Sequence, residues 1–120
     1  MTKFTILLGL SVALWLTPAS AAERAWYGFH IKPNTSGFPL NPVVTSVVID
    51  KIKSNSPADA QNMRVGDEII EAEGKTVPGA RALQLISILT KQPGDWLHLR
   101  LRRPDGASYA VLIQGIKKPD

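Results

Sequence analysis

Side chains that could act as nucleophiles, bases or acids occur in this sequence, but not in an arrangement that predicts catalysis. Ser46, His30 and Asp50 supply the three groups of a hydrolytic triad. Nothing in the sequence fixes their mutual geometry, and no Gly-x-Ser-x-Gly elbow is present. Ser87 and Lys91 lie one helical turn apart, but the lysine falls at an exposed helix end, and Ser-Lys chemistry needs a buried lysine. We therefore do not expect an enzyme.

Metal binding and nucleic-acid binding are not predicted either. The chain has no cysteine, which excludes disulfides and thiolate metal sites, and His30 and His98 lack a carboxylate at ligand spacing. The densest basic group is Arg100, Arg102 and Arg103, which alternates with leucines as the solvent face of a strand does. The formal net charge of +4 is mildly basic and too dispersed for a nucleic-acid interface. We expect no cofactor and no nucleic-acid partner.

The N-terminal segment 1–22 has the order of a secretory signal peptide. Lys3 precedes an uncharged apolar run, and small residues with one proline follow it. Cleavage after Ala21 or Ala22 would leave residues 23–120 as one domain, periplasmic or secreted. The alternative is an uncleaved membrane anchor, because a bilayer-spanning helix requires about 20 apolar residues. In both cases we expect the domain to be exported.

The chain after this segment shows the patterns of a small α+β domain. Alternating and β-branched runs predict strands, and apolar residues spaced by three and four predict one long helix. Ser56 is suited to cap a short helix that begins at Pro57, and Asn62 is suited to end it. The turn-rich stretch 32–42 predicts a loop. The expected strands are 26–31, 43–52, 68–72, 76–77, 96–102 and 108–114, and the expected helices lie within 54–61 and 78–91. These elements predict a partly open β-barrel of five to six strands, capped by one long and one short helix.

The run SPADAQNMRVGDEII, residues 56–70, resembles the central signature of PDZ domains. That signature consists of Ser/Gly-Pro-Ala, a short helix, Gly-Leu, a Gly-Asp-x-Ile turn into a strand and a later turn glycine, here Gly74. Asn62 stands where the family usually has glycine, and asparagine tolerates a positive φ. Met63 replaces a common leucine of similar volume.

The segment Trp26-Tyr27-Gly28-Phe29 resembles the carboxylate-binding loop of the same family. The loop is usually Gly-apolar-Gly-apolar, so tryptophan departs from the pattern at the first position. The element order is similar to that of the circularly permuted PDZ domains in bacterial periplasmic proteases of the high-temperature-requirement type. In those domains a C-terminal strand, here 108–114, fills the sheet position that animal PDZ domains give to their first strand.

The resemblance implies a module that binds peptides by strand addition. A ligand would pair with residues 29–32, and backbone N–H groups of the loop would hold its C-terminal carboxylate, with Gly28 allowing the sharp turn. Its last side chain would enter an apolar pocket between this strand and the long helix. The implied peptide-binding residues are Trp26, Tyr27, Gly28, Phe29, His30, Ile31, Ala82, Ile86 and Leu89, with His30 pointing away from the groove. A helix register shifted by one residue would present Leu83, Ser87 and Thr90 instead.

Two hypotheses about partners follow from the resemblance. In the first, the module binds the C-terminus or an extended segment of a partner protein, with membrane association only if residues 1–22 are not cleaved. In the second, the chain is a regulatory or structural subunit that docks on an envelope protease or secretion complex and takes no free peptide. Selection from a random C-terminal peptide library distinguishes them, because only the first predicts an enriched motif.

Overall fold

The computed structural model describes residues 24–37 and 39–119. The elements run in the order β1 (Phe29–Ser36), β2 (Val43–Ile52), α1 (Pro57–Ala60), β3 (Glu68–Ala72), β4 (Lys75–Thr76), α2 (Ala82–Leu89), β5 (Trp96–Arg102) and β6 (Ser108–Gln114). The predicted signal segment, 1–22, lies outside the described residues and stays a prediction. Neither helix of the described residues has the length and apolar composition that crossing a membrane would require.

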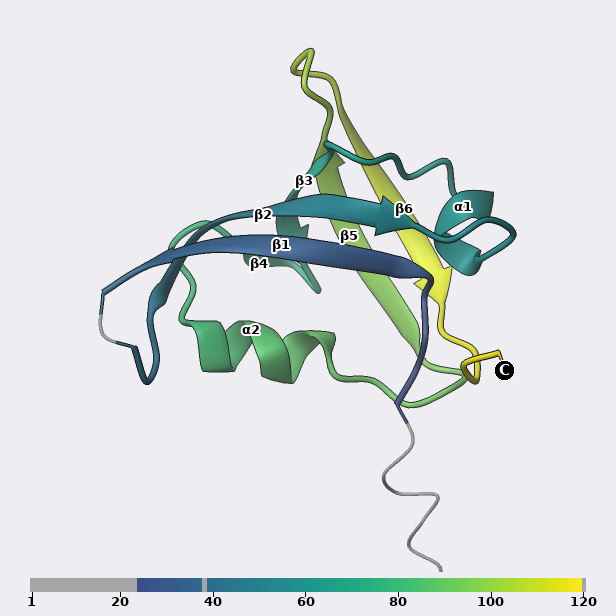
Figure 1. Cartoon of the computed structure of the whole chain (residues 1–120), viewed down its shortest axis with the longest axis horizontal. Coiled ribbons are helices and arrows are strands. Elements are labelled where there is room, and N and C mark those ends of the chain that lie inside the picture. Colours follow the sequence, from purple (N-terminus) through teal and green to yellow (C-terminus); the bar gives the residue numbers. More distant parts are fainter. Residues whose placement is uncertain (1–23, 38, 120) are drawn as a thin grey trace, which may run out of the picture.

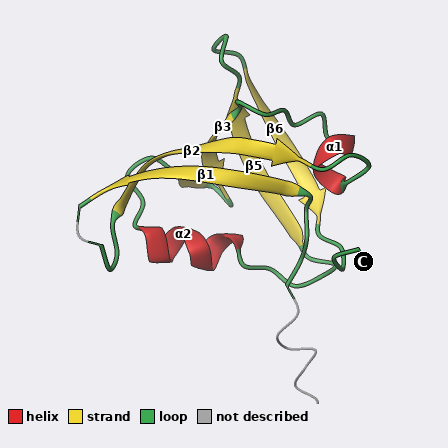
Figure 2. Cartoon of the chain, in the orientation of Figure 1, coloured by secondary structure: helices red, strands yellow, loops and turns green. Residues whose placement is uncertain are grey.

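The strands form one bent antiparallel sheet in the order β1-β2-β3-β5-β6, with β4 paired to β3. β1 and β2 form an arch, with α2 beneath it and α1 beside β6 (Figures 1 and 2). The arch joins the rest of the sheet at a single register pair, Val48 opposite Glu68. The predicted α+β class, with a partly open sheet and two helices, is confirmed.

The hydrophobic core lies inside the bend of the sheet. The leucines of β5 are buried and every residue between them is exposed, as alternation along a half-buried strand predicts. β6 alternates in the same way, and Leu85 is the buried residue of α2. The largest fully buried side chains include Ile49, Ile69, Leu97, Leu99, Leu101 and Ile113. The core therefore joins β2, β3, β5 and β6, with Leu85 of α2 packed against it.

β1 was predicted over 26–31 but spans Phe29–Ser36, so the predicted loop over 32–42 was wrong for residues 32–36. β1 pairs with β2 as far as Ser36, which lies opposite Val43. The segment is rich in polar residues and contains Pro33, which disfavour strands. However, β1 is an edge strand, where a proline is tolerated, and its pairing with β2 overrides local propensity.

α2 spans Ala82–Leu89 rather than the predicted 78–91. The preceding residues, 78–81, run beside the start of β2, where the Val44 N–H donates to the Ala80 carbonyl at 2.7 Å. Pro78 and Gly79 lie in a turn that the Ala80 N–H closes on the Val77 carbonyl at 3.0 Å, and the extended Arg81 bridges to Val43, so the helix begins only at Ala82. The apolar periodicity identified the helix but could not place its ends.

The N-terminus of α2 is capped from outside the helix. Its own N-cap residue, Arg81, makes no side-chain cap bond. Instead, the Leu83 N–H donates to Oδ1 of Asn41 at 3.0 Å. Asn41 belongs to the β1–β2 loop, so this bond ties α2 to the arch and sets their separation.

We expect Asn41→Ala to lower the free energy of unfolding by about 0.5–2 kcal/mol, the effect of losing a helix cap. Chemical denaturation measures the change. Asn34→Ala is the matched control, because its exposed side-chain bond to Ser46 lies on the surface, where substitutions usually change stability by less than about 0.5 kcal/mol. Equal effects of the two substitutions would contradict the capping role.

The short helix α1 forms as predicted. The Ser56 hydroxyl accepts from the Asp59 N–H at 3.2 Å, and Asn62 has a φ of 62°. The next turn was predicted one residue too late: β4 begins at Lys75, so the turn residues are Glu73 and Gly74, with φ of 52° and 78°. The local sequence does not indicate that Glu73 adopts a positive φ, because this backbone conformation is unusual for glutamate.

Candidate functional site

An apolar hollow of about 120 Å³ lies between β1 and α2. β1 contributes every second side chain, and α2 contributes residues spaced by three and four, as the geometry of strands and helices requires. The lining residues are Ile31, Pro33, Thr35, Val44, Ala82, Leu85, Ile86 and Leu89. None of them is titratable, so the hollow suits an aliphatic side chain rather than a charged one.

The helix presents the first of the two registers that the sequence allowed. Ala82, Ile86 and Leu89 line the hollow, whereas Leu83 does not. Leu85 is buried and forms the floor, and Ile86 is 56% exposed at the rim. Of the predicted site residues, the structure brings these three and Ile31 together. The sequence reasoning did not include Pro33 and Thr35, because the far half of β1 was read as a loop. It also did not place Val44 of β2 or Leu85 of α2 at the site.

The loop before β1 leaves two backbone donors unpaired. The Tyr27 carbonyl accepts from the Ala58 N–H at 2.9 Å, and the Gly28 carbonyl accepts from the Lys53 N–H at 2.7 Å. The N–H groups of Tyr27 and Gly28 donate to no acceptor among the described residues. Both residues are buried, and buried backbone donors are nearly always paired. An anionic group at the mouth of this loop would satisfy both donors.

Gly28 is required for two reasons. Its φ of +88° is a conformation that side chains disfavour. In addition, a Cβ atom at this position would lie 2.1 Å from Cβ and 2.3 Å from Oγ of Ser56. The loop therefore rests directly on the residue that caps α1, and that contact positions its N–H groups. The sequence indicated the turn but not the contact.

Tyr27 lies in the core and not in the hollow, contrary to prediction. Its exposed fraction is 7%, and its hydroxyl has no hydrogen-bond partner among the described residues. Burial raises the pKa of Tyr27 to about 12, and the negative charges of Asp95 and Glu73 add to the effect. A Cβ at Gly115 would lie 3.1 Å from the Tyr27 ring, so this glycine makes room for the aromatic side chain.

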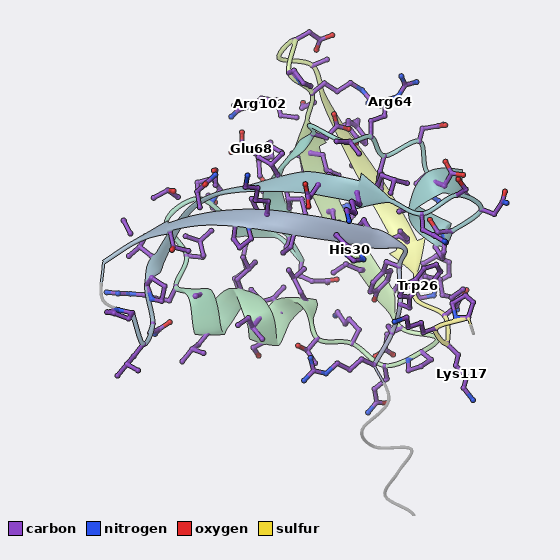
Figure 3. The ribbon with its side chains drawn as sticks, in the orientation of Figure 1. Trp26, His30, Arg64, Glu68, Arg102 and Lys117 are labelled. Carbon is purple, nitrogen blue, oxygen red and sulfur yellow. The ribbon has the colours of Figure 1, made fainter. Side chains whose placement is uncertain are left out.

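The other aromatic residues and His30 also lie away from the hollow. Phe29 packs against the core, 6.0 Å from the Tyr27 ring between centroids. His30 is exposed, in agreement with its predicted outward direction. Trp26 borders a second hollow of about 320 Å³ together with Lys53, Lys118 and Pro119. Figure 3 shows Trp26 and Lys117 on the same side of the molecule. The loop residues can thus reach a ligand through their backbone more readily than through their side chains.

Asp67, from the Gly-Asp turn of the signature, is a buried carboxylate at the centre of a polar cluster. Its side chain is 1% exposed, and Oδ2 accepts from Arg103 Nη1 at 3.1 Å, from the Arg64 N–H at 3.2 Å and from the Tyr109 hydroxyl. The Arg103 guanidinium lies 4.3 Å from the centre of the Tyr109 ring. Burial and the hydrogen bond to Asp67 raise the pKa of Tyr109 well above its ordinary value. This cluster links β3 to β6 and has a structural role.

No three histidine, aspartate or glutamate side chains in the described part of the chain lie together as a metal site requires. The chemistry of the site therefore rests on its apolar lining and its backbone donors. The bent sheet, the helix across its arch and the loop before β1 define a small domain built around a strand–helix groove.

The model of the PDZ-domain family matches residues 27–112, and the chain belongs to this family. The photosystem II D1 C-terminal processing protease has a similar fold, with a TM-score of 0.63 and 19% identity over 82% of this chain and 24% of that one. The PDZ domain of a carboxy-terminal protease from Vibrio cholerae, in complex with peptide, has a TM-score of 0.61 and 19% identity over 82% of this chain and 98% of that one. No curated protein matches the chain. The predicted PDZ resemblance is confirmed.

Proposed function

We propose that the domain binds C-terminal segments of partner proteins in the groove between β1 and α2, by strand addition to β1. The observation that carries the proposal is the pair of unpaired N–H groups at Tyr27 and Gly28, directly before the strand that borders the apolar hollow. A carboxylate has two acceptor oxygens and can pair with both donors. The bound peptide in the similar Vibrio cholerae domain supports this assignment.

The proposed module binds without catalysing a reaction, and it works outside the cytoplasm. The lining of the hollow supports the first point, because none of its side chains can transfer a proton at neutral pH. The order of Lys3, the apolar run and the small residues up to Ala22 supports the second. Intact mass of the protein from its native host would reveal whether the first 21 or 22 residues are removed.

A docking subunit is the second candidate function, and one observation favours it. Trp96, Leu112 and Ile116 are exposed large hydrophobic residues. Trp96 and Leu112 belong to β5 and β6, so these side chains lie outside the β1–α2 groove. In this case a partner would cover the β5–β6 surface while the groove takes no peptide.

Amidating the C-terminus of a bound peptide should weaken its affinity by about 1.5–3 kcal/mol, the value of a hydrogen bond to a charged group. Ile86→Lys should also weaken binding, because it places a charge at the apolar rim. Leu83→Lys is the matched control: Leu83 is 58% exposed on the same helix, against 56% for Ile86, but does not line the hollow. The probe is a nonapeptide selected from a random C-terminal library, measured by calorimetry as free acid and as amide.

The outcomes separate the two candidate functions. If the amide binds as well as the acid while Ile86→Lys still loses binding, the groove takes internal strands and not C-termini. If the library yields no ligand, or Ile86→Lys and Leu83→Lys behave alike, the groove proposal fails and the docking subunit becomes the better account.

A further inference from the structure

β1 is the outer strand of the sheet, so one of its edges has no neighbouring strand in the part of the chain that the structure describes. This is the edge on which a peptide would pair, and the inference below rests on that proposed function. Over residues 31–34 the register with β2 is regular, with Ile31 opposite Ile49 and Pro33 opposite Val47. The side chains of Ile31 and Pro33 both line the hollow. Residues two apart in a strand direct their backbone groups to the same edge.

Pro33 has no N–H group, and a proline inside a sheet is found where its nitrogen faces away from the neighbouring strand. The pairing of β1 with β2 continues past this residue, so the missing donor belongs to the free edge. Ile31 faces the same edge and has both an N–H and a carbonyl to offer. The hydrogen-bonding edge available to a peptide is therefore complete at Ile31 and incomplete at Pro33.

The strand also bends directly beyond Pro33. The register with β2 shifts between Asn34 and Thr35, which marks a bulge that twists the strand locally. The Asn34 carbonyl accepts from Oγ1 of Thr45 at 3.0 Å, and the Asn34 side chain donates to Oγ of Ser46 at 2.8 Å. Asn34 is thus held towards β2 and away from the free edge.

We infer that Pro33 limits the length of peptide that this domain recognises. A peptide whose carboxylate occupies the loop can make paired backbone bonds as far as Ile31, which corresponds to about its last four residues. Residues further upstream meet only the Pro33 carbonyl, without its matching N–H, and then the bulge, so they gain at most one ladder bond. The hollow itself continues to Thr35, so upstream contacts come mainly from side chains. The ligand class is then a short, free C-terminal segment and not a long extended strand.

The test is a length series on wild-type protein and on Pro33→Val. Valine restores the N–H and keeps an apolar, strand-favouring side chain. The probes are free-acid peptides of four, six and eight residues that share the last four residues of the library-selected ligand and have serine upstream. On wild-type protein we expect affinity to change less than 2-fold with length. On Pro33→Val we expect the longer peptides to bind about 2- to 10-fold more tightly, the effect of one net hydrogen bond.

Lys32→Val is the matched control. Lys32 lies opposite Val48, and its N–H and carbonyl point towards β2 rather than towards the free edge. It should show no dependence on peptide length. A steady rise of wild-type affinity from four to eight residues would overturn the inference, even if Pro33→Val failed to fold. Equal length dependence in wild type and a folded Pro33→Val would overturn it as well. In both results the four-residue peptide still binds, whereas failure of the proposed function itself appears as no binding by any probe.

Discussion

Gly28→Val should abolish peptide binding and lower the free energy of unfolding by about 2–5 kcal/mol, through strain at positive φ together with overpacking. The loop cannot move away from Ser56 without displacing the N–H groups of Tyr27 and Gly28, because its carbonyls are bonded to β2 and α1. Stability and function are therefore lost together. Chemical denaturation and calorimetry with the selected nonapeptide measure the two effects.

Gly74→Val separates strain from contact. Gly74 also has a positive φ, of +78°, but an added Cβ there meets no atom within 4 Å. Gly74→Val should therefore lower the free energy of unfolding by less than Gly28→Val, and it should leave peptide binding unchanged. Adding Ser56→Gly to Gly28→Val removes the clashing atoms, while glycine remains an acceptable N-cap, so the double variant should regain part of the stability. Equal losses for Gly28→Val and Gly74→Val would show that the contact with Ser56 does not matter.

Asp67→Ala should lower the free energy of unfolding by about 1–3 kcal/mol, the cost of removing a buried acceptor from its donors, because the Arg103 side chain is 28% exposed and can still be solvated. The substitution leaves the Arg103 guanidinium, the Tyr109 hydroxyl and the Arg64 N–H without their shared acceptor. Urea denaturation of the variant measures the loss. Because the cluster lies away from the hollow, variant protein that remains folded should keep its peptide affinity.

Glu68→Ala is the control for Asp67→Ala, because Glu68 is the next residue and forms an ion pair of its own. Glu68 bonds Arg102 at 2.9 Å, and the two labelled side chains lie close together in Figure 3. The Arg102 side chain is half exposed, and such surface pairs contribute about 0–1 kcal/mol. A loss for Asp67→Ala no larger than that for Glu68→Ala would mean that the buried cluster does not stabilise the fold.

The sequence predicted β2, β3, β5 and β6 with their observed bounds, because their β-branched or alternating residues agree with their burial. β1 and the start of α2 were misplaced for a common reason. The far half of β1 forms only because β2 pairs with it, and α2 begins where Asn41, distant in sequence, supplies its cap. The local residue pattern reveals neither the pairing of β1 with β2 nor the cap that Asn41 supplies.

The candidate site was predicted in part. Ile31, Ala82, Ile86 and Leu89 line one hollow because helix and strand periodicity determined their faces. Tyr27 was predicted as a peptide-binding residue because the resemblance places it in the carboxylate-binding loop, whereas the space left by Gly115 admits its ring to the core. The partners of Asp67 come from separate strands and loops, and such convergence is visible only in three dimensions.

β1 and β2 are bonded to each other along their length, but β2 meets β3 at the single pair Val48–Glu68. Segments with few buried backbone bonds to their surroundings open at the lowest free energy. The ribbon of β1 and β2 is held to the rest of the molecule by few backbone bonds, at Ile49 to residues 66 and 67 and at Val44 to residues 79 and 80. It should therefore open at a lower free energy than β5 and β6, which pair with each other along their whole length. A peptide added to β1 would give this ribbon a third strand and raise its opening free energy. Ligand binding would then slow amide hydrogen exchange in the arch and leave exchange in β5 and β6 unchanged.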